Sequence, residues 1–340
     1  PLLYDDQCFV IAEAGVNHNG DVATAKALID AAAKAGADAV KFQTFRADLL
    51  VNRDASKAAY QVETTGSEET QYDMLRKLEL PDAAFKELKD RCDAQGVMFM
   101  STPFDEASAD LLDSLSMEIF KIGSGELTNL DFLRHVARKS KPMILSTGMS
   151  RLGEIEAAID AVVEEGIDDL VLMHCVSNYP ADPSEMNLRA IETMAIAFDR
   201  PVGLSDHTEG IEVALAAVAL GATVIEKHFT LDRSQNGPDH RASIEPDQLE
   251  SLVRGIRSVE AALGDGLKRP SPSEADVMAV ARRSLVVSQN LPAGATLTSE
   301  VLTARRPGTG LPPMAKPYVL GRKLRVDVRA GTLLNLEMLV

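Results

Sequence analysis

The sequence predicts a TIM (β/α)8 barrel followed by a small β-rich domain, and three observations support this prediction. From residue 8 to residue 265, eight short apolar runs alternate with amphipathic helical stretches. Eight strand–helix units in a stretch of this length match the usual barrel of about 250 residues. An open, doubly wound sheet would show a Gly-rich dinucleotide turn after the first run, but Glu13-Ala-Gly-Val-Asn-His-Asn-Gly20 stands there instead.

The eight apolar runs have the length and composition of strands that are buried on both faces. Each is too short for a helix, and most are rich in β-branched residues or leucine. The runs span residues 8–14, 39–42, 97–100, 119–122, 143–145, 170–173, 202–204 and 223–225.

The stretches between these runs predict amphipathic helices. Four of them, residues 23–35, 82–95, 154–165 and 211–220, are each followed directly by a glycine. Glycine at that position favours the left-handed turn that ends a helix. Each of these helices is therefore expected to end where the chain turns into the next strand.

The chain length of 340 residues exceeds what one hydrophobic core normally supports, so one large and one small domain are expected. The charged, Pro-rich stretch at residues 264–274 is typical of a linker. We therefore predict a catalytic barrel over residues 1–265, a linker over 266–281 and a separate domain over 282–340.

The C-terminal segment contains a short internal repeat. Residues 291–302 and 328–339 share Ala-Gly, Leu, Glu and Leu in the same register, which indicates a small β-rich fold with pseudo-symmetry. Between the two halves lies the basic loop Arg305-Arg-Pro-Gly-Thr-Gly310. This loop is either a solvated turn or a segment that brings its arginines to an active site.

Composition excludes several classes of function. A net charge of −16 argues against nucleic acid as a partner, because phosphate backbones require basic surfaces. Any anion site must be built locally from lysines, arginines, hydroxyls and backbone amides.

No run reaches the roughly 18 apolar residues of a membrane span, and residues 1–6 do not have the basic-then-apolar pattern of a signal peptide. The three separated cysteines (Cys8, Cys92, Cys175) suggest reduced thiols, hence a soluble cytoplasmic protein.

Polar side chains stand in the last residues of all eight apolar runs or directly after them, where the catalytic groups of a barrel lie. In chain order they are Glu13, Asn17 and His18; Lys41, Gln43 and Thr44; Ser101 and Thr102; Lys121, Ser124 and Glu126; Ser146 and Thr147; His174, Ser177 and Tyr179; Ser205, Asp206 and His207; Glu226, Lys227 and His228. Charged groups at the ends of buried strands are costly unless they are paired or used. This ring of residues therefore favours an active site at the mouth of the barrel.

Two histidines in the ring can converge on one metal ion. His207 and His228 follow strands seven and eight, which are neighbours in a barrel. Two imidazoles suit Mn, Fe, Co or Zn better than Mg. The alternative is that each histidine is a hydrogen-bonded structural residue.

Two lysines and two Gly/hydroxyl turns favour an anion pocket. Lys41 and Lys121 can each bind phosphate or carboxylate, form a Schiff base, or extend to solvent. The turns Gly123-Ser-Gly125 and Ser146-Thr-Gly148 present N–H groups and hydroxyls to an anion. Glu13 and the strand-four Glu126 are candidate acid/base groups.

A series of short motifs runs in order through nearly the whole chain. They are Ile11-Ala-Glu-Ala-Gly-Val-Asn-His-Asn-Gly20, Val40-Lys-Phe-Gln-Thr44, Ser101-Thr-Pro-Phe104, Phe120-Lys-Ile-Gly-Ser-Gly-Glu126, Leu145-Ser-Thr-Gly-Met149, His174-Cys175, Asn178-Tyr-Pro180, Gly203-Leu-Ser-Asp-His-Thr208, Glu226-Lys-His-Phe-Thr230, Gly237-Pro-Asp239 and Arg306-Pro-Gly-Thr-Gly310. In this series the chain resembles the sialic acid synthases. These nonulosonate synthases condense phosphoenolpyruvate with an N-acetylated hexose and carry an antifreeze-like (SAF) C-terminal domain.

The resemblance implies a role for each matching residue. A divalent ion, usually Mn²⁺, is expected on His207 and His228, and Glu13 matches the carboxylate with an acid/base role. The residues expected to bind phosphoenolpyruvate are Lys41, Gln43, Lys121, Ser124, Ser146 and Ser205. Those expected to meet the acceptor sugar are Tyr179, Asp239 and Arg306, the last reaching it from the partner subunit of a domain-swapped homodimer. Thr102 and Glu126 complete the expected substrate-binding set.

The acceptor sugar is the point on which the sequence leaves alternatives open. The first expectation is an N-acetylneuraminate synthase that uses N-acetylmannosamine. The alternative is a legionaminate synthase that uses 2,4-diacetamido-2,4,6-trideoxymannose, because residues 57–80 resemble both groups. Ser177 followed by Asn178 departs from the pattern of some members, so the contact to the acceptor amide stays open. Rivals of other classes are a Schiff-base aldolase and a carbohydrate- or ice-binding protein built on the C-terminal domain.

Overall fold

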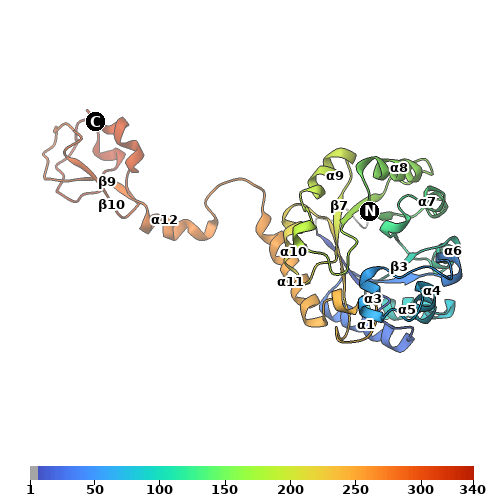
Figure 1. Cartoon of the computed structure of the whole chain (residues 1–340). Helices are drawn as coiled ribbons and strands as arrows, with labels where there is room; N and C mark the ends of the chain where they lie inside the picture. The colour runs from blue at the N-terminus through green and yellow to red at the C-terminus, as the bar shows by residue number, and fades with distance from the viewer. Residues whose placement is uncertain (1–6) are drawn as a thin grey trace. The chain divides into compact units, whose positions relative to one another are not determined.

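The computed structural model describes residues 7–340, which divide into two compact units (Figure 1). The first unit ends at Gly264, and the second spans Asp265–Val340. Residues 1–6, for which we expected no signal segment, lie outside the described residues. Between residues 7 and 340, no helix is both long and apolar enough to cross a bilayer.

The first unit is a barrel of eight parallel strands, as predicted. The hydrogen-bonded order is β3-β2-β1-β8-β7-β6-β5-β4, and β3 packs beside β4 to close the ring. The strands are β1 (Phe9–Gly15), β2 (Ala39–Thr44), β3 (Met98–Pro103), β4 (Phe120–Ile122), β5 (Met143–Ser146), β6 (Leu170–Cys175), β7 (Val202–Asp206) and β8 (Val224–His228).

Several strands extend past the apolar runs from which they were predicted. β2 continues to Thr44, β7 to Asp206 and β8 to His228, because parallel pairing goes on after the side chains become polar. Glu13 of β1 pairs in register with Lys41 on one side and with His228 on the other. Most of the polar residues predicted for the site therefore stand on strands, whose backbone is fixed by hydrogen bonds to the adjacent strands of the barrel.

Eight helices surround the strands (Figure 1). They are α1 (Val22–Ala35), α5 (Asp82–Gln95), α6 (Glu106–Ser114), α7 (Leu130–Ala137), α8 (Leu152–Val163), α9 (Ala190–Phe198), α10 (Glu212–Ala219) and α11 (Pro246–Leu263). Helix α1 shows how the sequence sets their bounds. The Asp21 carboxylate accepts from the Ala23 and Thr24 amides at its start, and Gly36 ends it at φ 83°. Its apolar stripe, which includes Leu28 and Ile29, is fully buried against the barrel.

The connection from β2 to α5 is the longest excursion above the barrel. It contains three short helices, α2 (Ala47–Leu50), α3 (Ala59–Thr65) and α4 (Gln71–Leu78). Their apolar residues form a separate cluster, in which Met74 and Leu78 of α4 pack with Val16 and Phe45. The excursion thus has a small hydrophobic core of its own beside the mouth of the barrel.

The second unit is built from turns, isolated bridges and short elements around a small core. Its elements are α12 (Ala275–Ala281), β9 (Ser284–Val287), β10 (Leu302–Arg305) and α13 (Lys316–Val319). Helix α12 lies inside the segment that we expected to be a linker. The two sequence repeats meet where Leu291 and Val328 exchange both backbone hydrogen bonds at 2.9 Å. Gly294 and Gly331, at matching positions, both have positive φ.

Candidate functional site

The floor of the site follows from the two-residue period of the strands. An apolar layer fills the barrel interior and consists of Ile11, Ala39, Met100, Ile119, Ile144, Val171, Met173 and Val224, with Phe9 and Met98 packed against it. Two residues after a member of this layer, seven strands place a polar or thiol side chain. These are Glu13, Lys41, Thr102, Lys121, Ser146, Cys175 and Glu226. Because successive strand residues alternate between faces, all seven belong to the same inner face as the apolar layer.

Glu226 joins the two lysines at the centre of this floor. Its carboxylate lies 3.3 Å from the Lys121 ammonium and 3.7 Å from that of Lys41. The Ser205 hydroxyl donates to it at 3.0 Å, and the Lys121 ammonium also donates to Ser146 at 2.7 Å. All of these side chains are buried. From the sequence, Glu226 was placed at a strand end without a role.

Glu13 shares Lys41 with Glu226. The Glu13 carboxylate lies 2.7 Å from the Lys41 ammonium and accepts from the Gln43 amide at 3.2 Å. Lys41 also donates to Thr102 at 2.9 Å. The structure therefore brings these predicted residues from β1, β2 and β3 into one polar network.

The two carboxylates of the network differ in their protonation. Burial raises the pKa of Glu13 to about 7, and repulsion from Glu226 adds to this effect while Lys41 opposes it. Burial acts in the same direction on Glu226, but the ammonium groups of Lys121 and Lys41 outweigh it and lower that pKa to about 2. Near neutral pH the floor therefore holds one firmly ionised carboxylate and one that can take up a proton.

His207 and His228 stand side by side at the mouth of the barrel, with ring centroids 5.4 Å apart. The Nδ1 of His207 lies 2.7 Å from the Val176 carbonyl, and donation there leaves its Nε2 as an acceptor. The Nδ1 of His228 is buried and has no hydrogen-bond partner among the described residues. Burial lowers the pKa of both histidines, so both rings are neutral near pH 7.

This pair fits a divalent ion. Neutral imidazole nitrogens are metal ligands, and a ligating histidine is usually oriented by a hydrogen bond from its other ring nitrogen, as His207 Nδ1 makes to Val176. The Nε2 of His207 lies 3.3 Å from the Ser205 hydroxyl, which donates to Glu226 and so leaves this nitrogen able to bind a metal. Within residues 7–340, no group of three or more His, Cys, Asp or Glu side chains is arranged to hold a metal. A metal here would therefore rest on two histidines, with other positions left to substrate and water.

A second group of hydroxyls surrounds Gly148, after β5. The Ser124 hydroxyl accepts from the Gly148 amide at 3.0 Å and contacts the Cys175 thiol at 3.1 Å. A Cβ atom on Gly148 would overlap the Ser177 hydroxyl and lie 2.8 Å from both Ser124 and Cys175. The three side chains thus pack directly against Gly148, where only glycine leaves room for them, and all three line the neighbouring cavity. Small polar groups held in this way can offer hydrogen bonds to an anionic oxygen.

These groups line one cavity of about 460 Å³ at the mouth of the barrel. Its lining includes the predicted residues Glu13, Lys41, Gln43, Thr102, Lys121, Ser124, Ser146, Tyr179, Ser205, His207 and His228. Tyr179 stacks near His207, with ring centroids 4.2 Å apart, and Tyr60 of α3 stands 5.1 Å from Tyr179.

Three predicted residues lie outside this cavity. Glu126 and Asp239 line a side pocket of about 320 Å³ that shares several walls with the main cavity. Burial raises the pKa of Asp239 to about 6. Arg306 is exposed and belongs to the second unit, in the turn that follows β10.

Three side chains from the β2–α5 excursion line both pockets, and none of them had a role predicted from the sequence. They are Tyr60, Gln61 and Gln71. The only sequence signal for them was the resemblance of residues 57–80 to two groups of synthases. Strand periodicity cannot find such residues, because they lie on helices above the barrel.

Comparisons with known proteins agree on one family. Residues 28–268 match the NeuB family, and residues 282–340 match the SAF domain. The chain is 49% identical to an N,N'-diacetyllegionaminic acid synthase of Legionella pneumophila, over 97% of this chain and 94% of that protein. It is 48% identical to a protein of the same name from Campylobacter jejuni, over 92% of this chain and 94% of that one.

A solved structure extends the likeness to three dimensions. It is an N-acetylneuraminic acid synthetase from Leptospira borgpetersenii in complex with citrate, 36% identical to this chain. The match covers 80% of this chain and 90% of the other, with a TM-score of 0.71.

Proposed function

Since this chain belongs to the NeuB family of nonulosonate synthases, which condense phosphoenolpyruvate with an acetylated sugar, we propose that it makes N,N'-diacetyllegionaminic acid. The acceptor would be 2,4-diacetamido-2,4,6-trideoxymannose. The observation behind this choice is that two relatives with identities of 49% and 48% over nearly the whole chain carry that name. It favours the alternative acceptor over N-acetylmannosamine, which we had expected first.

Phosphoenolpyruvate would bind on the charged floor of the main cavity. Lys41 and Lys121 supply positive charge for its phosphate and carboxylate, and the hydroxyls around Gly148 and on Ser146 supply donors. When Glu13 takes up a proton, the two ammoniums outnumber the one remaining carboxylate, Glu226. A floor with net positive charge can hold an anion in a chain whose net charge is −16.

The reaction then follows from the substrates. Carbon 3 of phosphoenolpyruvate attacks the aldehyde of the open-chain sugar, and the aldehyde oxygen takes a proton. The positive charge left at carbon 2 is met by water, which loses a proton, and the carbon–oxygen bond to phosphate then breaks. Glu13, with its pKa of about 7, is suited to hold or release a proton near these atoms.

The metal would assist at the acceptor. The family generally depends on a divalent ion, and His207 and His228 are the residues that fit it. When bound, Mn²⁺ or a similar ion would act as a Lewis acid toward the sugar aldehyde. Tyr179 lies against both rings and would help to orient the sugar beside them.

The remaining acceptor contacts are assigned to Asp239, Glu126 and Arg306. Asp239 and Glu126 line the side pocket that joins the main cavity. We propose that Arg306 acts on the barrel of the partner subunit in a domain-swapped homodimer. The exposed position of this arginine in a turn of the second unit is compatible with such a role.

One assay tests this proposal. The protein is incubated with phosphoenolpyruvate and Mn²⁺, with either 2,4-diacetamido-2,4,6-trideoxymannose or N-acetylmannosamine, and phosphate release and product mass are measured. We expect kcat/KM to favour the diacetamido sugar by about tenfold or more. A preference for N-acetylmannosamine would contradict the assignment of the acceptor. Borohydride trapping of a pyruvate adduct on a lysine would favour the Schiff-base aldolase instead.

A further inference from the structure

The side pocket has a composition that differs from that of the main cavity. Its floor is the apolar cluster of Val16, Phe45, Met74 and Leu78, against which Leu50 and Leu75 pack. The four residues of the cluster are nearly fully buried. The main cavity beside this apolar floor is lined by lysines, carboxylates and hydroxyls. The two together are complementary to a ligand that is polar over most of its length and apolar at one end.

Three side-chain amides line the side pocket. Gln43 belongs to β2, and its amide donates to Glu13 of the charged floor at 3.2 Å. The other two, Gln61 and Gln71, come from α3 and α4 and differ in how far their hydrogen-bonding capacity is used. The side chain of Gln61 already has partners within the protein. Its Oε1 accepts from the Ala58 backbone amide at 3.0 Å, and its Nε2 donates to the Tyr60 hydroxyl at 3.3 Å. Gln71 makes one long contact, from its amide to the Gln61 carbonyl at 3.5 Å. Among the described residues no donor reaches the side-chain oxygen of Gln71, Oε1, so this atom is available to a ligand N–H.

This combination matches the groups that distinguish the two candidate acceptors. The diacetamido sugar has a second acetamido group at carbon 4 and a methyl group at carbon 6, where N-acetylmannosamine has hydroxyls. Each methyl group placed on the apolar floor would strengthen binding, because its apolar surface leaves water. A hydroxyl in the same place would lose its water without gaining a partner.

We infer that the side pocket binds the 4-acetamido and 6-deoxy end of the acceptor, and that Gln71 is a specificity-determining residue. The inference rests on the proposed function, because it assigns part of that acceptor to a part of the site. The carbonyl of Gln71 would accept from the N–H of the 4-acetamido group, and the apolar floor would receive the methyl groups.

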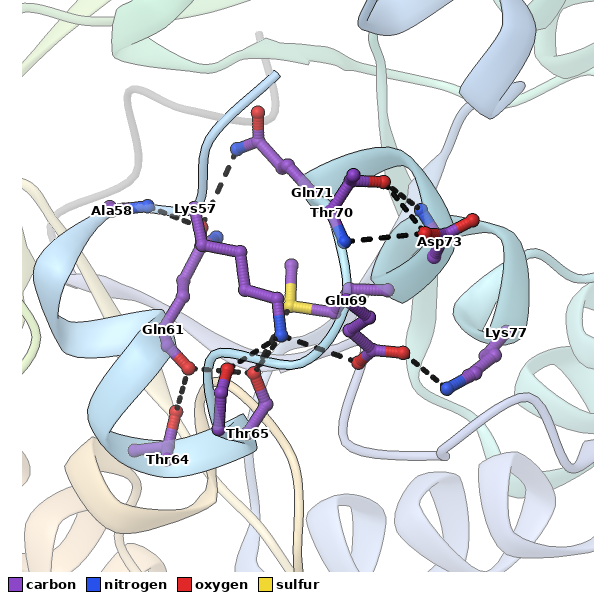
Figure 2. A network of polar contacts seen from close by, with 12 residues as sticks. Lys57, Ala58, Gln61, Thr64, Thr65, Glu69, Thr70, Gln71, Asp73 and Lys77 are labelled. Carbon is purple, nitrogen blue, oxygen red and sulfur yellow. Dashed lines mark hydrogen bonds and ion pairs between the residues drawn. The ribbon is translucent and has the colours of Figure 1, made fainter. Parts of the chain in front are cut away.

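Helices α3 and α4, which form the wall of the side pocket that carries Gln71, are held together by contacts within the protein. Figure 2 shows the Lys57 ammonium between α3 and α4, where it donates to the Thr65 hydroxyl and the Gly66 carbonyl, each at 2.9 Å. It also lies 3.4 Å from Glu69, which in turn pairs with Lys77 of α4. The Lys57 side chain is only 1% exposed, although its partners Gly66 and Glu69 keep contact with water. A preformed wall can discriminate between sugars, because little of the binding energy is spent on ordering it.

Two substitutions test the inference from different sides. Gln71→Leu keeps the approximate size of the side chain and removes both polar atoms, while Leu75→Phe fills part of the side pocket. Gln95→Ala, at the exposed end of α5, is the matched control for a lost glutamine. For each protein we would measure kcat/KM with both acceptors, KM for phosphoenolpyruvate, and binding of the diacetamido sugar alone by calorimetry.

We expect each of the two variants to lower the ratio of kcat/KM, diacetamido sugar over N-acetylmannosamine, by about tenfold or more. Calorimetry should show weaker binding of the diacetamido sugar, and Gln95→Ala should match the unaltered protein. An unchanged ratio in both variants, in proteins with normal thermal unfolding, would overturn the inference while the proposed function stands. If the unaltered protein itself prefers N-acetylmannosamine, the proposed function fails first, and the inference falls with it.

Discussion

Gly148 is a residue at which the proposed anion site depends on the absence of a side chain. Any Cβ there would overlap the Ser177 hydroxyl and crowd Ser124 and Cys175, whose side chains would have to rotate away. Because the obstructed atoms are the ends of small side chains, the fold can adjust, but the arrangement of hydroxyls cannot be kept.

We therefore expect Gly148→Ala to raise KM for phosphoenolpyruvate by about tenfold, or ~1.4 kcal/mol, with little change in thermal stability. Gly153→Ala is the matched control, since a Cβ at Gly153 meets nothing within 4 Å. Steady-state kinetics at saturating acceptor would measure the effect. An unchanged KM in the Gly148 variant would show that this turn does not hold the anion.

A second prediction for a single residue concerns His207 and the proposed metal site. His207→Ala removes one of two proposed metal ligands, so turnover should fall by at least about a hundredfold and its dependence on Mn²⁺ should disappear. Binding of Mn²⁺, followed by electron paramagnetic resonance, should weaken in parallel. His135→Ala, on the outer face of α7 beside Asp110, serves as the control. Full activity in His207→Ala would refute the metal assignment.

Single residues also show how far the sequence alone could predict the site. Lys41, Lys121, Ser146 and His228 were found because each stands in or just after an apolar run, and the two-residue period places them inside the barrel. The same period identifies Glu226, two residues after Val224, yet its role became clear only when the structure showed both lysines beside it. A sequence shows which face a side chain occupies but does not show its partners on other strands.

At the scale of elements, strands and helices were predicted well where the pattern is periodic. Helix α5 has the bounds expected from its apolar stripe, and several strands differ only by continuing into polar residues. The excursion with α3 and α4 was not predicted as helices, because its short elements depend on the cluster around Met74 and on the Lys57 contacts. Such long-range contacts leave no periodic trace in the sequence.

Lys57 gives a test of how these two helices are held. Lys57→Met keeps the length of the side chain but leaves the Gly66 carbonyl and the Glu69 carboxylate without this donor, so the free energy of unfolding should fall by about 1–3 kcal/mol. KM for the acceptor should rise more than KM for phosphoenolpyruvate, because α3 and α4 line the side pocket. Chemical denaturation and steady-state kinetics would measure the two effects. Lys86→Met, which loses only an exposed pair with Asp90, should change neither quantity appreciably. Equal changes in both KM values would show that the excursion acts on the whole site.

At the scale of the whole molecule, the second unit has its own core and contributes an exposed arginine. Arg306→Ala should lower kcat/KM for the acceptor by about tenfold or more while leaving the thermal unfolding of the protein unchanged. Arg329→Ala, also exposed in the second unit, is the control. Mixing Arg306→Ala with an active-site variant of the barrel would restore activity if the arginine serves the partner subunit. Normal activity of a chain that ends at Gly264 would contradict this role.

For the whole reaction, we propose that this barrel joins phosphoenolpyruvate to an acetylated sugar and releases phosphate by breaking the carbon–oxygen bond. Phosphoenolpyruvate labelled with ¹⁸O at the oxygen that bridges carbon 2 and phosphorus tests the claim most directly. Mass spectrometry of both products should find the label in the released phosphate and none of it in the nonulosonic acid. Label retained in the sugar acid, or carbon–carbon bond formation with pyruvate in place of phosphoenolpyruvate, would contradict it.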